Sequence, residues 1–314
     1  MFLLNLEFKM MSKNGIVTTK LAREFMTMKK GDRIDTVSSY AKKFESARGT
    51  VQNGLKLLEE ENCVKLLKRG HLGTFITYID YEKLWKFTNW GALVGVSPLP
   101  YTRRHEGIAT AIYYQMEERH IPFNFAYMQG AGNRIRGLLN QRYDFAILSK
   151  KSAMKYLKEY GNLKIAMEFK PYSYISGYVF LFSEAIYGEI VDGMKLGIDT
   201  NSPDHVELTE KIAEGKTVEY INVPYSRMIP SILEGLIDGA VYNKDTINKP
   251  EIRGAISYKE IDLKGHDAGE KTRAVILVNK EAFGVENLIK QLIDSDEVER
   301  IQEEVIYEKI IPTY

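Results

Sequence analysis

The stretch from residue 35 to residue 77 constrains the fold of this 314-residue chain more strongly than any other. Twice in succession its apolar residues recur at the three- and four-residue spacing of an amphipathic helix, with a tight turn between the two patterns. Two strand patterns joined by a glycine-containing turn follow. This order of parts predicts a helix-turn-helix with a two-stranded wing, a fold that can place one helix in the major groove of DNA.

We expect three helices in this N-terminal head. The first covers about residues 18–28, and either Asp35 or Thr36 caps the second. The third covers about residues 46–61, and the wing covers about residues 63–79. In the third helix apolar residues alternate with polar ones at helical spacing, so one face is expected to be buried and the other to meet solvent or DNA.

The polar residues on the outer side of the head are of the types that contact DNA. Arginine can pair with guanine and glutamine or asparagine with adenine, whereas serine, threonine and lysine suit phosphates. A recognition helix presents such groups from its N-terminal half, where the helix dipole also favours phosphate. We therefore predict DNA contacts from Lys42, Ser46, Arg48, Thr50, Gln52, Asn53, Lys56 and, in the wing, Arg69 and His71.

The distribution of charge agrees with such a head. Residues 1–80 contain 14 Lys or Arg and 9 Asp or Glu, a net charge of +5, whereas the whole chain has a net charge of +1. The remaining residues are therefore mildly acidic. A basic head on an acidic body suits a protein in which only the head meets phosphate. An uneven but merely solvated surface is the alternative that charge alone leaves open.

The same stretch resembles the winged helix-turn-helix of the GntR family of bacterial transcription factors. The resemblance rests on Gly31–Ile34, on Ser46–Leu55, which is similar to the family's recognition helix, and on Arg69–Ile76, which is similar to its wing. Four departures mark the head as divergent: Ile34-Asp35-Thr36 replaces the usual Leu-Pro-Ser, Ser46-Ala47-Arg48 carries one extra residue between serine and arginine, Gly54 replaces the usual alanine, and Asn62 replaces the usual glycine. The resemblance implies DNA binding.

Beyond residue 92 the pattern changes to alternating strands and helices. This order predicts open, mostly parallel sheets that bind ligands at the carboxyl ends of their strands. The pattern occurs twice, because residues 135–148 and 229–242 both consist of a helix, a turn with aspartate and an apolar strand. We therefore expect a winged head at residues 1–79, a linker at 80–92 and a two-lobed α/β ligand-sensing domain at 93–314, with its second lobe at about 180–275.

This doubled pattern resembles the type II periplasmic-binding-protein fold, in which two α/β lobes close on a small ligand. The resemblance covers about residues 91–314. A GntR-like head joined to such a body is in turn similar to the YhfZ family of bacterial regulators. These resemblances imply a transcriptional regulator that responds to a small, anionic metabolite bound between the two lobes.

Ligand contacts should come from the turns that follow the strands. Two glycines in one such turn would let backbone amides approach an anion, and three basic side chains would neutralise it. The predicted ligand-binding residues are Ser97, Tyr101, Gln129, Gly130, Gly132, Asn133, Arg134, Ser149, Lys150, Asn201, Ser202, Tyr225, Ser226, Arg227 and Tyr242.

The sequence offers little support for catalysis. The five histidines are scattered and Cys63 is the sole cysteine, so neither a metal site nor a disulfide is expected. Gly130-Ala131-Gly132 lacks the third glycine of a dinucleotide motif, since Ile135 stands there, and we expect no cofactor. Two alternatives stay open: a binding-protein-like lyase or synthase acting on an anionic metabolite, and an architectural DNA-binding protein, which would not need so large an α/β body.

The start of the chain bears on its compartment. Residues 1–15 are apolar only briefly, because Glu7 interrupts them and no cleavage site of small residues follows. No run of about 18 apolar residues occurs, so no membrane span is expected. We therefore expect a cytoplasmic homodimer whose two heads bind the half-sites of a double-stranded DNA operator.

Overall fold

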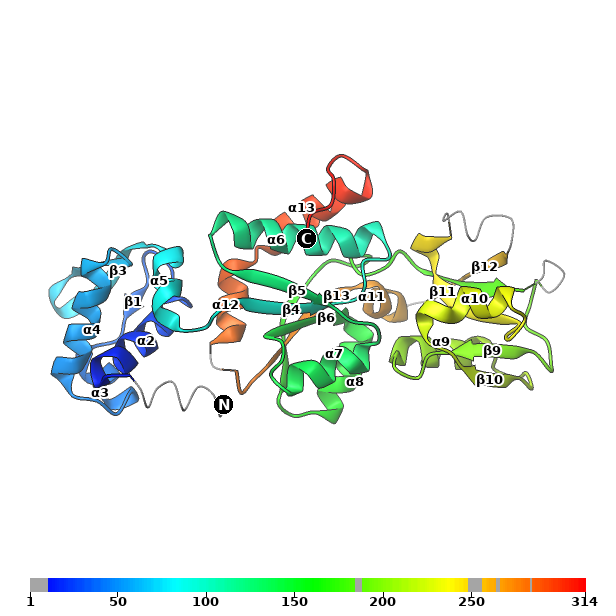
Figure 1. The fold of residues 1–314 in the computed structure, drawn as a ribbon, viewed down its shortest axis with the longest axis horizontal. Coiled ribbons are helices and arrows are strands. Elements are labelled where there is room, and N and C mark those ends of the chain that lie inside the picture. Colours follow the sequence, from blue (N-terminus) through cyan, green and yellow to red (C-terminus); the bar gives the residue numbers. More distant parts are fainter. Residues whose placement is uncertain (1–10, 184–187, 248–255, 264–265, 283) are drawn as a thin grey trace. The chain divides into compact units, whose positions relative to one another are not determined.

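The computed structural model describes residues 11–183, 188–247, 256–263, 266–282 and 284–314 (Figure 1), so most of the apolar start considered above lies outside the described residues. The chain forms two compact units. The first comprises residues 1–93, 115–123 and 284–293, and the second comprises residues 94–114, 124–283 and 294–314. Within the described segments, no helix combines the length and the apolarity that crossing a bilayer requires.

The head is a winged helix-turn-helix, as predicted. Its elements are α2 (Lys13–Phe25), β1 (Arg33–Ile34), α3 (Val37–Lys43), α4 (Arg48–Glu60), β2 (Val64–Lys68), η1 (Gly70–Leu72) and β3 (Thr74–Ile79). The three strands form an antiparallel sheet in the order β1-β3-β2. Of the two expected caps it is Thr36 that begins α3, because its side chain accepts a hydrogen bond (3.1 Å) from the amide of Ser39.

Close packing of α2 on α4 explains one departure from the family pattern. Gly54 is buried in α4, and a Cβ atom there would lie 2.9 Å from Leu21 Cδ1 and 3.2 Å from Thr18 Oγ1 of α2. An alanine would therefore need one of these neighbours to move. The glycine lets the two helices approach each other.

Residues 80–92, expected as a linker, contain a helix of the first unit. This helix, α5 (Tyr81–Thr88), packs against α2. The Tyr81 hydroxyl donates to the backbone carbonyl of Met28 (2.8 Å) and accepts from Gln291 (2.9 Å), which belongs to α12 (Val285–Leu292). Helix α5 is therefore an ordered part of the first unit.

The first lobe contains a five-stranded sheet in the order β5-β4-β6-β13-β7. In Figure 1, α7 and α8 lie on one side of this sheet and α6 and α13 on the other. The elements are β4 (Leu93–Ser97), α6 (Arg103–Glu118), β5 (Phe123–Tyr127), α7 (Ala131–Leu139), β6 (Phe145–Ser149), α8 (Lys150–Glu159), β7 (Leu163–Glu168), β13 (Ala274–Asn279) and α13 (Ser295–Ile306).

The second lobe repeats this plan with a sheet in the order β10-β9-β11-β8-β12. Two apolar clusters form its interior. The elements are β8 (Tyr178–Phe182), β9 (Lys195–Ile198), α9 (Pro203–Ile212), β10 (Glu219–Asn222), η2 (Tyr225–Arg227), α10 (Met228–Leu233), β11 (Gly239–Asn243), η3 (Lys244–Thr246) and β12 (Ser257–Ile261). The helix that follows, α11 (His266–Thr272), packs against α8 and β6 of the first lobe.

The prediction of mostly parallel sheets was wrong, since both sheets are mixed. Strand β8 runs antiparallel to β11 and β12, and β13 runs antiparallel to β6 and β7. Each of these strands follows a crossing of the chain from one lobe to the other, so it enters its sheet from the opposite end. The sequence pattern also left α8, β7, α11 and β12 unpredicted.

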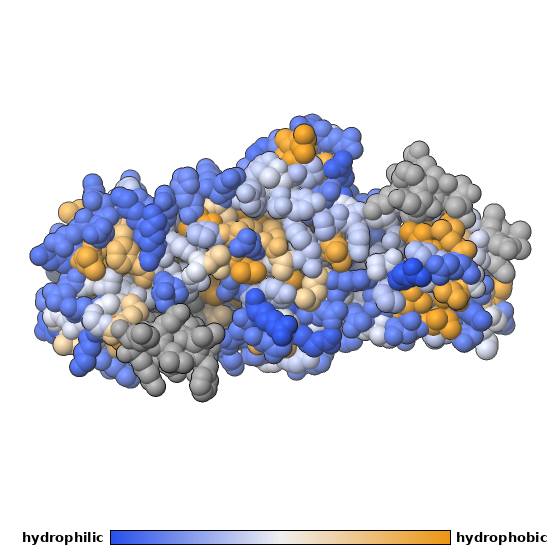
Figure 2. Space-filling view, in the orientation of Figure 1, coloured by the Kyte–Doolittle hydropathy of each residue, from blue (hydrophilic) through white to orange (hydrophobic). Residues whose placement is uncertain are grey.

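Apolar side chains also reach the surface of the second lobe. Figure 2 shows them gathered over α10, where Leu233 and the nearby Leu236 are each 55% exposed. Patches of this kind often mark contact surfaces in soluble proteins.

The backbone conformation of residue 62 explains another departure from the family pattern, the asparagine in place of glycine. Asn62 follows the C-cap of α4, Glu61, and has a φ of 55°, in the left-handed region that favours glycine. Asparagine enters this region more readily than other residues with a Cβ atom, because its short polar side chain can form local hydrogen bonds. Here the Asn62 amide donates to the carbonyl of Glu60 (3.3 Å).

We predict that Asn62→Ala lowers the free energy of unfolding of the head by about 1 kcal/mol, because alanine lacks this compensation in the left-handed region. Asn62→Gly should be as stable as the natural chain or more so. Urea denaturation followed by circular dichroism measures both, with Glu61→Ala as the control in ordinary helical geometry. Equal stability of Asn62→Ala and Asn62→Gly would contradict the explanation.

Candidate functional site

The head presents its predicted DNA-contacting residues at its surface. Arg48, Gln52, Asn53 and Lys56 are exposed along α4, Ser46 and Thr50 are half-buried near its start, and Lys42, Arg69 and His71 are exposed on α3 and the wing. Lys56 pairs with Glu60 (3.4 Å). Within the described part of the chain, no ion pair engages the other cations of this set, so their charges are available to phosphates.

The first turn of α4 is open to an anion. Ala47 occupies the N-cap and supplies no side-chain acceptor, so the leading amides of the helix lack the usual cap. A Cβ atom at Gly49 would meet nothing within 4 Å, which leaves room at this turn. A phosphate there would meet both amide donors and the positive end of the helix dipole.

One wing cation is held in place by an aromatic ring. The Arg69 guanidinium lies 5.2 Å from the centroid of the Phe75 ring, at a distance typical of a cation–π contact. This contact joins the residue that follows β2 to β3 on the other side of the wing. It limits the conformations of the side chain before any DNA is bound.

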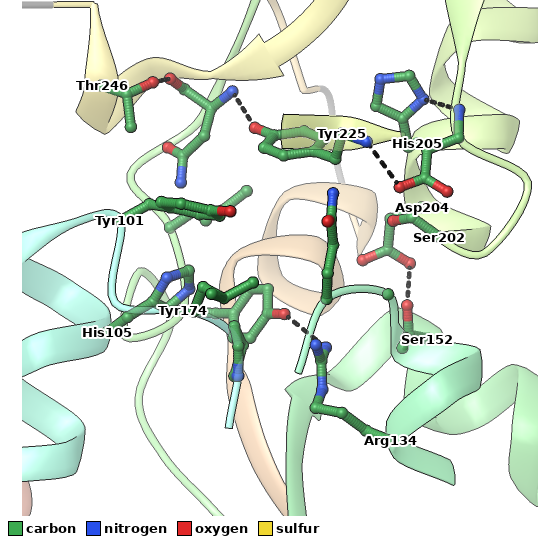
Figure 3. A pocket seen from close by; sticks show the side chains of 18 of the residues that line it. Tyr101, His105, Arg134, Ser152, Tyr174, Ser202, Asp204, His205, Tyr225 and Thr246 are labelled. Atoms are coloured by element: carbon green, nitrogen blue, oxygen red, sulfur yellow. Dashed lines mark hydrogen bonds between the residues drawn. The ribbon is translucent and has the colours of Figure 1, made fainter. Parts of the chain in front are cut away.

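The second unit contains a cavity of about 110 Å³ lined by residues of both lobes (Figure 3). Six of the predicted ligand-binding residues line it: Tyr101, Gln129, Gly130, Arg134, Ser202 and Tyr225. The other nine do not line it: Ser97, Gly132, Asn133, Ser149, Lys150, Asn201, Ser226, Arg227 and Tyr242. The structure thus brings together the residues of several of the predicted turns, but not every side chain in them.

Two of the three predicted cations lie outside the cavity lining and form ion pairs with carboxylates. Lys150 pairs with Glu168 (2.9 Å) and Arg227 pairs with Glu234 (3.2 Å). Both pairs are at least partly exposed, where ion pairs contribute little stability.

The two glycines allow the lobes to approach each other. Gly130 has a φ of 79°, and a Cβ atom there would lie 2.9 Å from the Asn201 Cβ atom of the other lobe. The Gly132 amide donates to the Asn201 carbonyl (3.2 Å). We expected these amides to face an anion, whereas the Gly132 amide is engaged in a contact between the lobes.

Arg134 is the charged residue that the first lobe contributes to the cavity lining. The side chain is 3% exposed, donating to the Met128 carbonyl (2.7 Å) and to the Tyr174 hydroxyl (3.3 Å). Its Nε has no hydrogen-bond partner, and no ion pair engages the guanidinium among the described residues. Burying a charge without a counter-charge is costly, and Arg134 has no carboxylate in an ion pair with it among the described residues.

His105 lies beside this guanidinium. Its ring forms an edge contact with Tyr174 (5.0 Å between centroids), and neither nitrogen makes a hydrogen bond of ordinary geometry. Burial and, to a smaller extent, the nearby Arg134 charge together lower the pKa of His105 to about 4. The ring is therefore neutral at neutral pH, when one nitrogen can donate a hydrogen bond and the other can accept one.

The wall from the second lobe is organised around Asp199 at the end of β9. Its carboxylate accepts from the amides of Asn201 (2.9 Å) and Tyr225 (3.0 Å). His205 accepts from the Asp199 amide (3.2 Å) through Nδ1, so its Nε2 donates to the Val241 carbonyl (3.0 Å). His205 is thus a neutral residue that ties β9 to β11, and Tyr242 supports Tyr225 by stacking on it (4.7 Å).

Asp204 joins the two lobes directly. It lies in the first turn of α9 and is 4% exposed. Its carboxylate accepts hydrogen bonds from the hydroxyls of Ser149 and Ser152 (2.9 Å for Ser152), both from the first lobe. Burial raises the pKa of Asp204, and the two hydroxyls oppose that rise. Gln129 adds a second bridge, since its side-chain amide lies 3.2 Å from Ser226 Oγ.

Sequence reasoning missed several residues of the lining, among them His105, Tyr174, Asp199, Asp204 and His205. A signal existed for Asp199, which ends an apolar strand, and for Asp204, which follows Pro203 at a helix start. None existed for Tyr174, because it lies in the segment that crosses between lobes. No group of His, Cys, Asp or Glu suited to a metal ion occurs in the described part of the chain.

The low pKa of the buried histidines predicts a pH effect on stability. The folded state holds fewer protons than the unfolded chain between about pH 4 and 6.5, so stability falls as the pH drops through this window. We expect His105→Phe, which keeps a ring against Tyr174, to remove one proton from this uptake on unfolding. The free energy of unfolding should then fall less steeply, by ~1.4 kcal/mol per pH unit. Thermal melts from pH 7 to 4 measure it, with the exposed His71→Ala as control. An identical pH profile for His105→Phe would contradict the assignment.

Comparison with known proteins agrees with this architecture. The family model of the YhfZ C-terminal domain matches residues 80–314, and a helix-turn-helix domain model matches residues 29–76. The uncharacterised protein YhfZ of Escherichia coli K12 is 28% identical over 311 residues, which cover 96% of this chain and 98% of that protein.

Solved structures show the same fold for the body. A crystal structure of YhfZ from Shigella flexneri has a TM-score of 0.59 and 26% identity, covering 72% of this chain and 94% of that one. The VFT2 domain of BvgS from Bordetella pertussis has a TM-score of 0.50 and 16% identity, covering 73% of this chain and 98% of that one. The body thus has the two-lobed α/β fold that these solved structures share, and the chain, with its helix-turn-helix head, belongs to the YhfZ family.

Proposed function

We propose that this protein is a DNA-binding transcriptional regulator whose body binds a small metabolite with an anionic group between its two lobes. The observation that supports an anionic ligand is Arg134, a buried guanidinium in the wall of the cavity that has no counter-charge among the described residues. A carboxylate or phosphate would supply that counter-charge and the acceptor that Nε lacks. His105 would add a hydrogen bond from the same lobe.

The proposed DNA contacts come from α4 and the wing. Arg48, Gln52 and Asn53 project from the first half of α4, with side chains suited to base edges. Lys42 and Arg69 flank this helix with charges suited to the phosphate backbone. As a homodimer the protein would present two such heads to half-sites about one helical turn apart.

Ligand binding would change DNA binding through the arrangement of the two lobes. Contacts between the lobes already exist at Asp204 and at Gly132, so a ligand that also spans the cavity favours this closed arrangement over an open one. The effect on the operator is limited by the difference between the ligand's affinities for the two arrangements.

Arg48→Ala should weaken binding to a duplex selected from a random library by the purified full-length protein. A lost pair with guanine costs about 1–3 kcal/mol, a fall in affinity of about fivefold or more, and relaxes specificity at that base pair. Fluorescence anisotropy measures the affinity. Lys216→Ala, an exposed change in the second lobe, is the control. Unchanged affinity of Arg48→Ala at every salt concentration would rule out α4 as the reading helix.

Lys42→Ala should act differently from Arg48→Ala. A lysine that meets a phosphate contributes to affinity for all sequences, so its loss should lower the slope of log affinity against log salt by about 1 without changing sequence preference. The same anisotropy titrations at several salt concentrations measure the slope. A changed sequence preference for Lys42→Ala would contradict a phosphate contact.

Arg134→Met should abolish the rise in melting temperature that an anionic ligand produces. The probes are inorganic phosphate, succinate, citrate and the small molecules released from the purified protein and identified by mass spectrometry. Lys150→Ala is the matched control, because that cation pairs with Glu168 outside the cavity lining and its loss should leave the rise intact. A rise preserved in Arg134→Met would remove the cavity from the mechanism.

A further inference from the structure

The two walls of the cavity carry opposite charges. Among the described lining residues, the first lobe contributes the cation Arg134 and the second lobe contributes the carboxylates Asp199 and Asp204. The two histidines of the lining, His105 and His205, are neutral at neutral pH, since burial holds the pKa of each at about 4. Across the cavity, charge therefore changes sign from one lobe to the other.

These charges do not neutralise each other. No ion pair joins Arg134 to either carboxylate in the described part of the chain, although all three side chains are at least 96% buried. Asp204 has two serine hydroxyls and the nearby Lys271 charge to stabilise it. Asp199 has two backbone amides and, within the described residues, no cation in an ion pair with it.

Asp199 also has acceptor capacity to spare. Each of its oxygens accepts one amide, whereas a carboxylate offers about four acceptor positions in all. Arg134 correspondingly has a spare donor at Nε. A buried guanidinium without a carboxylate and a buried carboxylate without a cation thus line one cavity from opposite sides.

We propose that the ligand is a zwitterion of amino-acid type, with its carboxylate bound by Arg134 and its ammonium group facing Asp199. This inference rests on the proposed function and specifies the ligand of the same site. A purely anionic ligand would leave Asp199 without a cation and add negative charge beside it. A zwitterion gives each buried charge its partner and leaves the net charge of the cavity unchanged.

The size and the walls of the cavity fit this class. A volume of about 110 Å³ is small for a nucleotide, because pockets for drug-sized molecules measure roughly 300–1,000 Å³. Tyr101, Tyr174 and Tyr225 face the cavity in Figure 3, and aromatic rings stabilise ammonium groups as well as apolar side chains. A molecule with opposite charges at its two ends also spans the lobes, which ties binding to closure.

The test uses the full-length protein and three matched sets of probes in thermal-shift and calorimetric titrations. The first set is the twenty protein L-amino acids. The second set is the matching amines, which lack the α-carboxylate, and the third is the matching carboxylic acids, which lack the α-amino group. We expect at least one amino acid to raise the melting temperature, and its amine and its acid each to bind at least tenfold more weakly. Asp199→Asn and Arg134→Met should each weaken the amino acid at least tenfold, whereas Lys150→Ala should not.

The outcomes separate this inference from the proposed function. If the acid lacking the amino group binds as well as the amino acid, or if only phosphate, succinate or citrate binds, the zwitterion is overturned and the anion-responsive regulator stands. If none of these probes binds and no small molecule co-purifies, both fail. Because the amine and acid probes leave the protein unaltered, the result holds even if Asp199→Asn misfolds through loss of its amide contacts.

Discussion

The structure of the body depends on two strands that each follow a crossing of the chain from one lobe to the other. β8 arrives from the first lobe and lies between β11 and β12, and β13 returns to lie between β6 and β7. Every residue of both strands is buried. Withdrawing either strand would break two ladders and expose an apolar face, so the lobes can change their angle but cannot separate. The crossing segment before β8 contributes Tyr174 to the cavity that the lobes share, and the first residue of β8 contributes Tyr178.

The polar groups at the junction of the two lobes are of two kinds, those that are paired without a ligand and those that are not. Asp204 receives two hydroxyls, and Gly132 donates to a carbonyl, so these polar groups are satisfied without a ligand. Arg134 and Asp199 are not satisfied in this way, because each retains a buried charge with no ion pair among the described residues. Satisfied contacts stabilise closure in the absence of ligand, whereas unsatisfied charges make closure stronger when a ligand is present. A regulator needs both, because its two arrangements must lie close in free energy.

Local patterns predicted the elements of the head and many of those of the body. Helical spacing and glycine positions placed α4 and β3 within about two residues, and Thr36 was one of two expected caps. The pattern failed for α8 and β7, and it missed β12, whose residues are mostly exposed and carry little apolar periodicity. Residue type alone could not show which cations reach the cavity. Lys150 and Arg227 follow strands as predicted, but they pair with nearby carboxylates and do not line the cavity.

By itself the sequence determined that a winged head precedes a doubled α/β body, because periodicity, caps and turns are local properties of the chain. It also determined that the strand ends of the body are rich in polar groups. Only the tertiary structure decided which of these groups share a cavity. Arg134 and Asp199 lie 65 positions apart, and they face one space only because the chain crosses between two sheets. Charge pairing across such distances depends on packing, which no local pattern encodes.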